Sequence, residues 1–299
     1  MGMVAPEPPR IRRSVSQLTS YAQCGEASRL QKVAKVPQRP ASWFHLGSAA
    51  HHQIEAYENS GRELTVAESI AGFEVEYDRL VAADLVRWPD WDAWLTGGRK
   101  GGQQDMEDRR VIGAYQVSDY IRYAEENAAS WRIIASEVKF EIDIGGVETL
   151  GFIDQIAQRA DGSIQVRDLK GGSTVPGSAF QLAVYGLAVE EYMGVKPSAA
   201  AFVKLARPAT ARGKAKPTTE LEHDLSLWSR DQLERMFRNF DRAESQGYYL
   251  ADPRDRCEMT CTVADYCTIP GKGFPEHAAK FAHILKREDY FATTKEVAA

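Results

Sequence analysis

The sequence predicts a mixed α/β fold in which a strand-rich unit is preceded by helices and followed by a cysteine-bearing segment. Residues 131–250 contain short runs of alternating apolar and polar side chains, which is the pattern of half-buried strands, and two runs at helical spacing. Residues 1–130 carry apolar side chains at helical spacing, and residues 251–299 hold three of the four cysteines. We expect these three regions to form one compact unit, with a helix at its C-terminal end.

The N-terminal region is expected to contain four helices. Ser14 is a suitable N-cap for the first, and Gly61 would end the second. Before the fourth helix, a stretch rich in glycine and charge predicts a mobile loop with three tryptophans packed beneath it, Trp88, Trp91 and Trp94. The expected helices cover residues 15–31, 41–61, about 65–86 and about 105–130.

The strand-rich unit is expected to supply the central sheet. Each expected strand is short, alternates in polarity and is bounded by turn residues or by a helical run. We expect strands at residues 133–144, 147–158, 163–170, 199–207 and 218–227, and helices at residues 178–194 and 229–247.

Charge is distributed unevenly along the chain. The formal net charge of -5 argues against a protein that is basic all over, but residues 192–219 contain six cations and no acid. This basic segment would either contact a nucleic acid or form a solvated loop. Its cations are Lys196, Lys204, Arg207, Arg212, Lys214 and Lys216.

The sequence also favours one cellular compartment. No apolar run approaches the roughly 18 residues that a membrane span needs, and the N-terminal MGMVAPEPPRIRR lacks the apolar centre of a signal peptide. We therefore expect a soluble, cytoplasmic protein with no membrane partner. Disulfides are disfavoured in a reducing cytosol, so the four cysteines point first to a metal or cluster site.

One predicted strand ends in charges where apolar side chains are expected. In IQVRDLK, Ile164, Val166, Asp168 and Lys170 share one face because successive side chains of a strand alternate. Charged groups are seldom buried unless they are paired or hold a metal. Two charges at the end of an inward stripe therefore indicate a polar site.

The preceding hairpin decides which acid meets Asp168. A three-residue loop at residues 160–162, with a left-handed glycine, sets Asp154 across from Asp168 and keeps Phe152 on the same inward face as Asp154. The two acids would then have β-carbons about 4.5–5.5 Å apart. That separation suits one hard divalent cation, with Lys170 beside it. The alternative is a hairpin whose acids are solvated beyond the core.

These motifs resemble the PD-(D/E)XK nuclease superfamily, specifically its RecB-like branch. GFID is followed by RDLK one hairpin later and by QLAVY on the next predicted helix. Upstream, LGSAAHHQIE is similar to the first motif of that branch, a glycine followed four residues later by histidine and then glutamate. The resemblance covers about residues 14–267. It implies a restriction-endonuclease-like mixed sheet flanked by helices, with helical additions and a C-terminal iron-sulfur segment.

The resemblance implies a role for each residue of the central motifs. His51, Asp154, Asp168 and the main-chain carbonyl of Leu169 would be ligands of Mg²⁺ or Mn²⁺, and Lys170 would be the catalytic lysine. A cation there would polarise the scissile phosphate, and the ammonium would orient water or neutralise developing charge. An imidazole ligand makes Mn²⁺ as suitable as Mg²⁺. Without the resemblance, His51 would be interpreted as an ordinary packed or surface histidine.

Three further residues would support this site. Gln181 and Tyr185 are four residues apart and so share a helix face. In the family this pair contacts nucleic acid and supports the lysine, whereas on its own it could be a packed tyrosine with an amide neighbour. Glu55, one turn after His51, would buttress that histidine. Glu137 falls on the polar side of its predicted strand, outside the expected ligands.

The cysteines resemble those of the iron-sulfur nucleases of the same branch, including AddB subunits and CRISPR-associated RecB-like exonucleases. These nucleases also have one early cysteine, here Cys24, and three late ones, here Cys257, Cys261 and Cys267. The resemblance implies a 4Fe-4S cluster held by four thiolates. However, three residues separate Cys257 from Cys261 where the family usually has two. A four-cysteine zinc site and unligated thiols are the alternatives.

The resemblance implies a metal-dependent DNA nuclease, an exonuclease on single-stranded ends that acts in recombination, repair or phage DNA metabolism. Its cell would be prokaryotic or phage-infected. The sequence shows no phosphate-binding loop, so unwinding would need a helicase or recombinase partner. A CRISPR adaptation accessory that trims DNA before integration would use the same chemistry. A DNA-binding module with a vestigial site is the alternative of another class, and the intact Asp154, Asp168 and Lys170 argue against it.

Overall fold

The computed structural model describes residues 12–197, 199–210, 213–254 and 257–267. Within them, five strands form one sheet in the order β1-β2-β3-β4-β5. Strands β3 and β4 are parallel and the other neighbouring strands are antiparallel, so the sheet is mixed, as predicted. The strands are β1 (Trp131–Ile144), β2 (Val147–Arg159), β3 (Ile164–Lys170), β4 (Ala199–Lys204) and β5 (Thr219–His223).

Helix α6 (Phe180–Met193) connects the two parallel strands. A parallel pair needs such a crossover, because a tight hairpin joins only antiparallel strands. The helix is apolar on most sides, and its residues from Phe180 to Val189 are almost all buried. It ends at Gly194, which adopts the left-handed conformation (φ 64°) that a glycine tolerates at a helix C-terminus.

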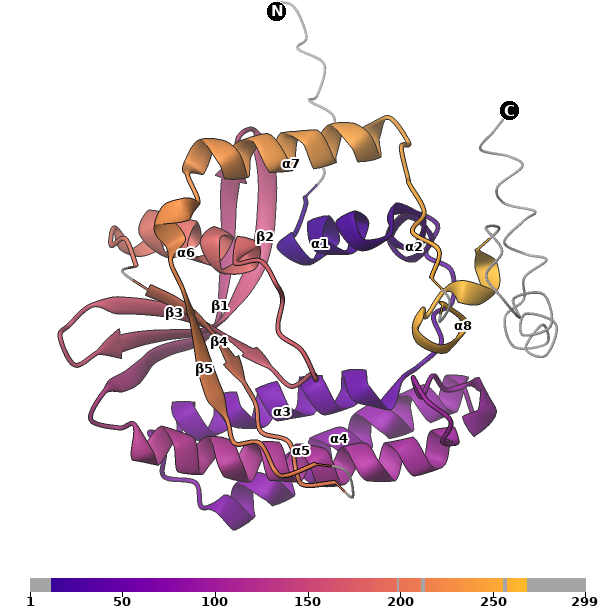
Figure 1. Ribbon diagram of the computed structural model, residues 1–299, viewed down its shortest axis with the longest axis horizontal. Coiled ribbons are helices and arrows are strands. Elements are labelled where there is room, and N and C mark those ends of the chain that lie inside the picture. The colour runs from indigo at the N-terminus through magenta and orange to yellow at the C-terminus, as the bar shows by residue number, and fades with distance from the viewer. Residues whose placement is uncertain (1–11, 198, 211–212, 255–256, 268–299) are drawn as a thin grey trace, which may run out of the picture.

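Helices cover both faces of the sheet (Figure 1). On one face, α1 (Val15–Gln23), α6 and α7 (Arg230–Ser245) share a core cluster with Val166 and Phe202. On the other face, a second cluster joins the sheet residues Leu169 and Val203 to three helices. These helices are α3 (Ser42–Asn59), α4 (Val66–Arg87) and α5 (Gly102–Glu126).

The prediction of one unbroken helix over residues 15–31 is wrong, because the helix is interrupted at Cys24. Cys24 has an extended backbone (φ -162°), after which α2 (Gly25–Ser28) and a π-helical turn (Arg29–Val33) follow. The backbone of Leu250 lies against this break and accepts a hydrogen bond from the N–H of Glu26 (3.3 Å). A Cβ added at Gly25 would lie 2.7 Å from the Leu250 nitrogen, so only a glycine allows this approach.

The remaining segments are short turns and loops. Trp88 and Trp94 are buried, and the Trp91 ring lies 4.8 Å from that of Trp94, so the tryptophans pack as predicted. The helix predicted at the C-terminal end, and Arg212 of the basic segment, lie outside the described residues. No helix in the described part of the chain has the length and apolar character needed to cross a membrane. The short helical turns are Trp91–Ala93, Leu225–Leu227, α8 (Cys257–Thr260) and Ala264–Tyr266.

Candidate metal centre

The β2–β3 hairpin brings two acids together. Its loop consists of residues 160–162, with Gly162 left-handed (φ 85°), and the strand ladder reaches the pair Gln155 and Arg167. One residue further in this register, Asp154 lies across from Asp168, as the loop length predicts. The Asp168 side chain is 2% exposed and that of Asp154 is 12% exposed.

Asp154 is held by the neighbouring strand and faces helix α3. The main-chain N–H of Leu169 donates to Oδ2 of Asp154 (2.8 Å), and Nδ1 of His51 lies 3.5 Å from the same oxygen. The Leu169 main chain also acts on the His51 ring and favours its protonated form. Helix α3 is placed here by the packing of its apolar face, including Leu46 and Ala50, against the helices and the sheet.

Asp168 is paired with Lys170, which is itself linked to α6. The Nζ of Lys170 lies 2.5 Å from Oδ2 of Asp168 and donates to Oε1 of Gln181 (3.1 Å). The Nε2 of Gln181 donates to the hydroxyl of Tyr185 (2.8 Å), one helical turn further on. The crossover helix that the parallel strands require therefore also fixes the position of the ammonium group.

Glu137 belongs to this cluster, so the prediction that it lies outside the ligands is wrong. The β1–β2 pairing shifts register at Ile134, and this bulge moves each later residue of β1 by one position against β2. Beyond the bulge, the register sets Glu137 across from Asp154, and Glu137 has a left-handed backbone (φ 47°). One ligand atom from each of His51, Glu137 and Asp154 lies within 4.8 Å of the other two.

The crowding of these acids changes their protonation. Burial, and then the nearby Asp154, raises the pKa of Glu137 to about 7. Burial also raises the pKa of Asp154, and burial together with the Asp154 charge raises the pKa of Asp168. Burial lowers the pKa of His51, so its ring is neutral near pH 7 and can offer a lone pair. Oxygen and imidazole donors of this kind suit Mg²⁺ or Mn²⁺.

The other expected residues lie around this centre in different ways. The oxygen of Asp168 faces Lys170, and Asp168 is not part of the closest group of ligand atoms. Glu55 lines the same cavity as His51 and its charge helps to raise the pKa of Glu137. Among the described residues, however, no hydrogen bond joins Glu55 to His51.

The centre opens into a cavity of about 670 Å³ between α3 and the strands, which we call the site cavity. Phe152 faces this cavity and is 48% exposed, so the prediction that it points into the core is wrong. The physical reason is the length of the sheet ladder. Strand β3 pairs with β2 only from Gln155 onward, which leaves Phe152 uncovered on that side. The residues that line the site cavity include Phe44, Gly47, His51, Glu137, Phe152 and Lys170.

The four cysteines line one small cavity between α2 and residues 251–267. All four are free thiols. The main-chain N–H of Asp252 donates to Sγ of Cys24 (3.4 Å), and that of Arg254 donates to Sγ of Cys257 (3.2 Å). Burial raises the pKa of Cys261 to about 11, so a cation or cluster would be needed to hold it as a thiolate at neutral pH.

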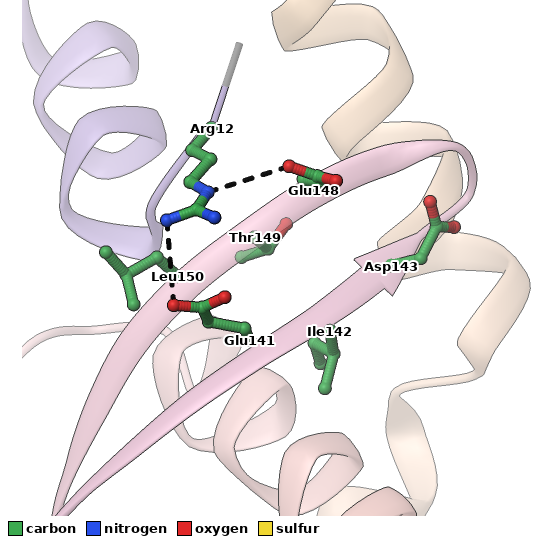
Figure 2. Close-up of a pocket in the computed structure, with 7 residues that line it drawn as sticks. All are labelled: Arg12, Glu141, Ile142, Asp143, Glu148, Thr149 and Leu150. Atoms are coloured by element: carbon green, nitrogen blue, oxygen red, sulfur yellow. Dashed lines mark ion pairs between the residues drawn. The ribbon is translucent and has the colours of Figure 1, made fainter. Parts of the chain in front are cut away.

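A separate cavity of about 260 Å³ lies near the turn of the β1–β2 hairpin (Figure 2). Arg12 lies 3.7 Å from both Glu141 and Glu148 there, so the acids of the two strands share one cation. None of the expected site residues lines this cavity. Its charges are explained by ion pairing across the hairpin.

Comparison with known families agrees with this arrangement. The family model of the PD-(D/E)XK nuclease superfamily matches residues 12–268. The chain belongs to the PD-(D/E)XK nuclease superfamily. The matched range includes the sheet, the hairpin acids, His51 and all four cysteines.

Two phage proteins resemble this superfamily member over most of their lengths. The gene 69 protein of Mycobacterium phage D29 is 31% identical over 268 residues, covering 86% of this chain and 96% of its own. The gene 69 protein of Mycobacterium phage L5 is 30% identical over 287 residues, with the same coverage. Among solved structures, a candidate exonuclease from Eubacterium rectale has a TM-score of 0.41 and 13% identity over 79% of this chain and 82% of its own.

Metal binding by this PD-(D/E)XK protein should depend on pH. The acids Glu137, Asp154 and Asp168 have raised pKa values, so near neutral pH the folded protein holds more protons than the unfolded chain. Stability without metal should therefore fall as the pH rises from about 4.5 to about 7 and change little above that. A cation replaces those protons, so Mn²⁺ should raise the melting temperature by about 5 °C at pH 8 and by much less at pH 5.5. Thermal melts in buffers of equal ionic strength measure this.

A matched pair of variants makes the test specific. Glu137→Gln should reduce the shift caused by Mn²⁺ at pH 8, whereas Glu63→Gln, at an exposed position, should leave it unchanged. Equal shifts at both pH values in the wild-type protein would show that the cation binds elsewhere.

Proposed function

We propose that the protein is a metal-dependent exonuclease of the RecB-like branch that acts on single-stranded DNA ends. The observation that carries this proposal is the Asp154–Asp168–Lys170 arrangement across one hairpin. Its lysine is paired with one acid and hydrogen-bonded to Gln181 at the wall of an open cavity. A DNA-binding module with a vestigial site would not need a buried acid pair, since burying carboxylates without a function is costly.

We propose a division of labour among the residues of the centre. His51, Asp154, Glu137 and the carbonyl of Leu169 would hold a divalent cation, with Asp168 joining them when Lys170 turns to substrate. The bound cation would polarise the scissile phosphate. Lys170, held by Gln181, would donate to the phosphate oxygen that gains charge in the transition state or orient the attacking water. Tyr185 would keep Gln181 in position through their hydrogen bond.

We propose that the four cysteines hold a 4Fe-4S cluster. Main-chain N–H groups already donate to two of the thiols, and such bonds stabilise the negative charge of cluster ligands. All four cysteines line one small cavity, so a single group placed there could take all of them as ligands.

The phage relatives support a setting in a prokaryotic or phage-infected cell. We propose a role in phage DNA metabolism, recombination or repair, with DNA strand separation supplied by a helicase or recombinase partner. The activity is tested with end-labelled linear and circular single strands in Mg²⁺ or Mn²⁺. Linear strands should be shortened from an end, circles should stay intact and EDTA should stop the reaction. Cleavage of circles at the same rate would contradict exonuclease action.

The basic segment should contribute phosphate contacts. It passes beside the site, because Lys204 of β4 pairs in register with Lys170, and Lys214 and Lys216 that follow are exposed. Replacing Arg207, Lys214 and Lys216 by glutamine should flatten the salt dependence of binding by about 0.7 per lost contact on single strands. Binding titrations at salt concentrations from about 50 to about 200 mM give this slope.

A control with the same charge change separates local contacts from net charge. Arg235, Arg238 and Arg242 lie on the exposed side of α7, and their replacement by glutamine should leave the slope unchanged. Equal slopes in both triple variants would show that the basic segment is a solvated loop that does not contact DNA.

A further inference from the structure

The site cavity is lined by aromatic side chains as well as by the metal-centre residues. Phe44 is 51% exposed and Phe152 is 48% exposed, and both line this cavity, one from α3 and the other from β2. Scattered exposed apolar residues are common on proteins and need no explanation. These two phenylalanines come from different elements and line one polar cavity, so their joint exposure needs an explanation.

Phe44 also lines a second cavity, of about 380 Å³. The charged residues that line this second cavity are Lys35, Arg39, Arg87 and one acid, Asp84. Lys35 and Arg87 are exposed, and neither forms an ion pair with a described residue. The second cavity therefore offers cations to a ligand, and Phe44 lines both this cavity and the site cavity.

The spacing along α3 fixes the distance between Phe44 and the metal centre. Phe44 precedes His51 by seven residues, which is about two helical turns or roughly 10 Å along the axis. Between them, Gly47 lines the site cavity, and a Cβ added there would meet nothing within 4 Å. The helix surface between the aromatic ring and the metal centre is therefore open to a ligand.

We propose that Phe44 and Phe152 stack on the bases of single-stranded DNA, whose backbone passes Phe44 into the cationic second cavity. Base stacking on aromatic rings combined with a basic track is the chemistry of single-strand binding, because every base has a flat face that a paired base hides in a duplex. The inference rests on the proposed nuclease function and adds to it the residues that select unpaired DNA.

The test is a binding titration with fluorescein-labelled oligothymidylate in Mn²⁺, in a Lys170→Ala background that prevents cleavage. Phe44→Ala should weaken binding roughly 5- to 150-fold, which is the range for one lost base stack. Phe44→Trp should retain the affinity, whereas Phe44→Leu should lose most of it despite its apolar side chain. Phe152→Ala should show a similar loss.

Two controls separate stacking from general damage. Tyr248→Ala removes an exposed aromatic ring that lines neither cavity, and its affinity should match the parent. An oligonucleotide with abasic sites across its length should bind the parent as weakly as the thymidylate strand binds a variant that carries both Phe44→Ala and Phe152→Ala, and neither substitution should weaken its binding further.

Other outcomes would overturn the inference in recognisable ways. If Phe44→Ala binds thymidylate strands like its parent, or loses the same affinity for blunt duplex, the aromatic residues do not select unpaired bases. Cleavage by the wild-type protein is measured in parallel. If the wild-type protein cleaves DNA but Phe44→Ala binds DNA with unchanged affinity, only this inference is refuted. If the wild-type protein never cleaves DNA, the proposed function is refuted.

Discussion

Lys170→Ala should reduce single-turnover DNA cleavage by roughly 10²- to 10³-fold or more, because it removes a donor needed mainly in the transition state. Metal affinity and DNA binding should stay close to wild type, since Lys170 is not among the proposed ligands. Asp168 would lose its ion-pair partner, but its raised pKa lets it take up a proton instead. Single-turnover rates with saturating enzyme, together with a Mn²⁺ titration, measure both properties.

Asp168→Ala should behave differently at the same site. It removes a proposed ligand, so metal affinity should fall together with the cleavage rate, and excess Mn²⁺ should restore part of both. Lys139→Ala, on the exposed side of β1, is the matched lysine control and should cleave at the wild-type rate. A folded Lys170→Ala protein that cleaves at the wild-type rate would refute the proposed mechanism. Equal losses of melting temperature in both variants, with normal turnover, would mean that the two charges are structural.

The hairpin acids could be predicted from the sequence because their geometry depends on local rules. Strand alternation and a three-residue loop with a left-handed glycine are enough to set Asp154 across from Asp168. The partners of Lys170 on α6 can be predicted for a similar reason. Gln181 and Tyr185 are one turn apart, and a helix keeps such residues on one face.

Glu137 could not be predicted, because its position depends on a bulge in β1. A bulge inserts one residue and shifts every later pairing with the neighbouring strand by one position, but IIASEVKF reads equally well as a regular strand. The exposure of Phe152 cannot be predicted for a related reason. It depends on where the β2–β3 ladder ends, and pairing partners are a tertiary property that alternation within one strand does not contain.

The break at Cys24 is a third tertiary effect. The residues around it have ordinary helical spacing, and the close approach of Leu250, which is distant in sequence, stops the helix there. This contact brings the early cysteine to the cavity that the three late cysteines line. Substitution of one of these cysteines therefore tests whether a bound group joins the two distant parts of the chain.

Cys261→Ala should remove the cluster and lower the melting temperature by several degrees. Anaerobically purified wild-type protein should be brown, with broad absorption near roughly 400 nm and about four iron and four sulfide ions per chain, as expected for a 4Fe-4S cluster. Ligand loss should cost stability as well, because the free energy of binding a structural metal site is also folding free energy. The cluster would join Cys24 to residues 251–267, so its loss frees a long closed loop.

Val263→Ala is the control that separates cluster loss from core damage. Val263 is fully buried in the cluster of apolar residues beside Cys261 and Cys267, so its truncation leaves a cavity that lowers stability by about 1–3 kcal/mol. That variant should keep its iron, sulfide and colour while its melting temperature falls, whereas Cys261→Ala should lose all of them together. Stoichiometric zinc without iron or sulfide in wild-type protein never exposed to oxygen would refute the cluster. A fully stable Cys261→Ala protein that keeps its iron would show that this thiol is not a ligand.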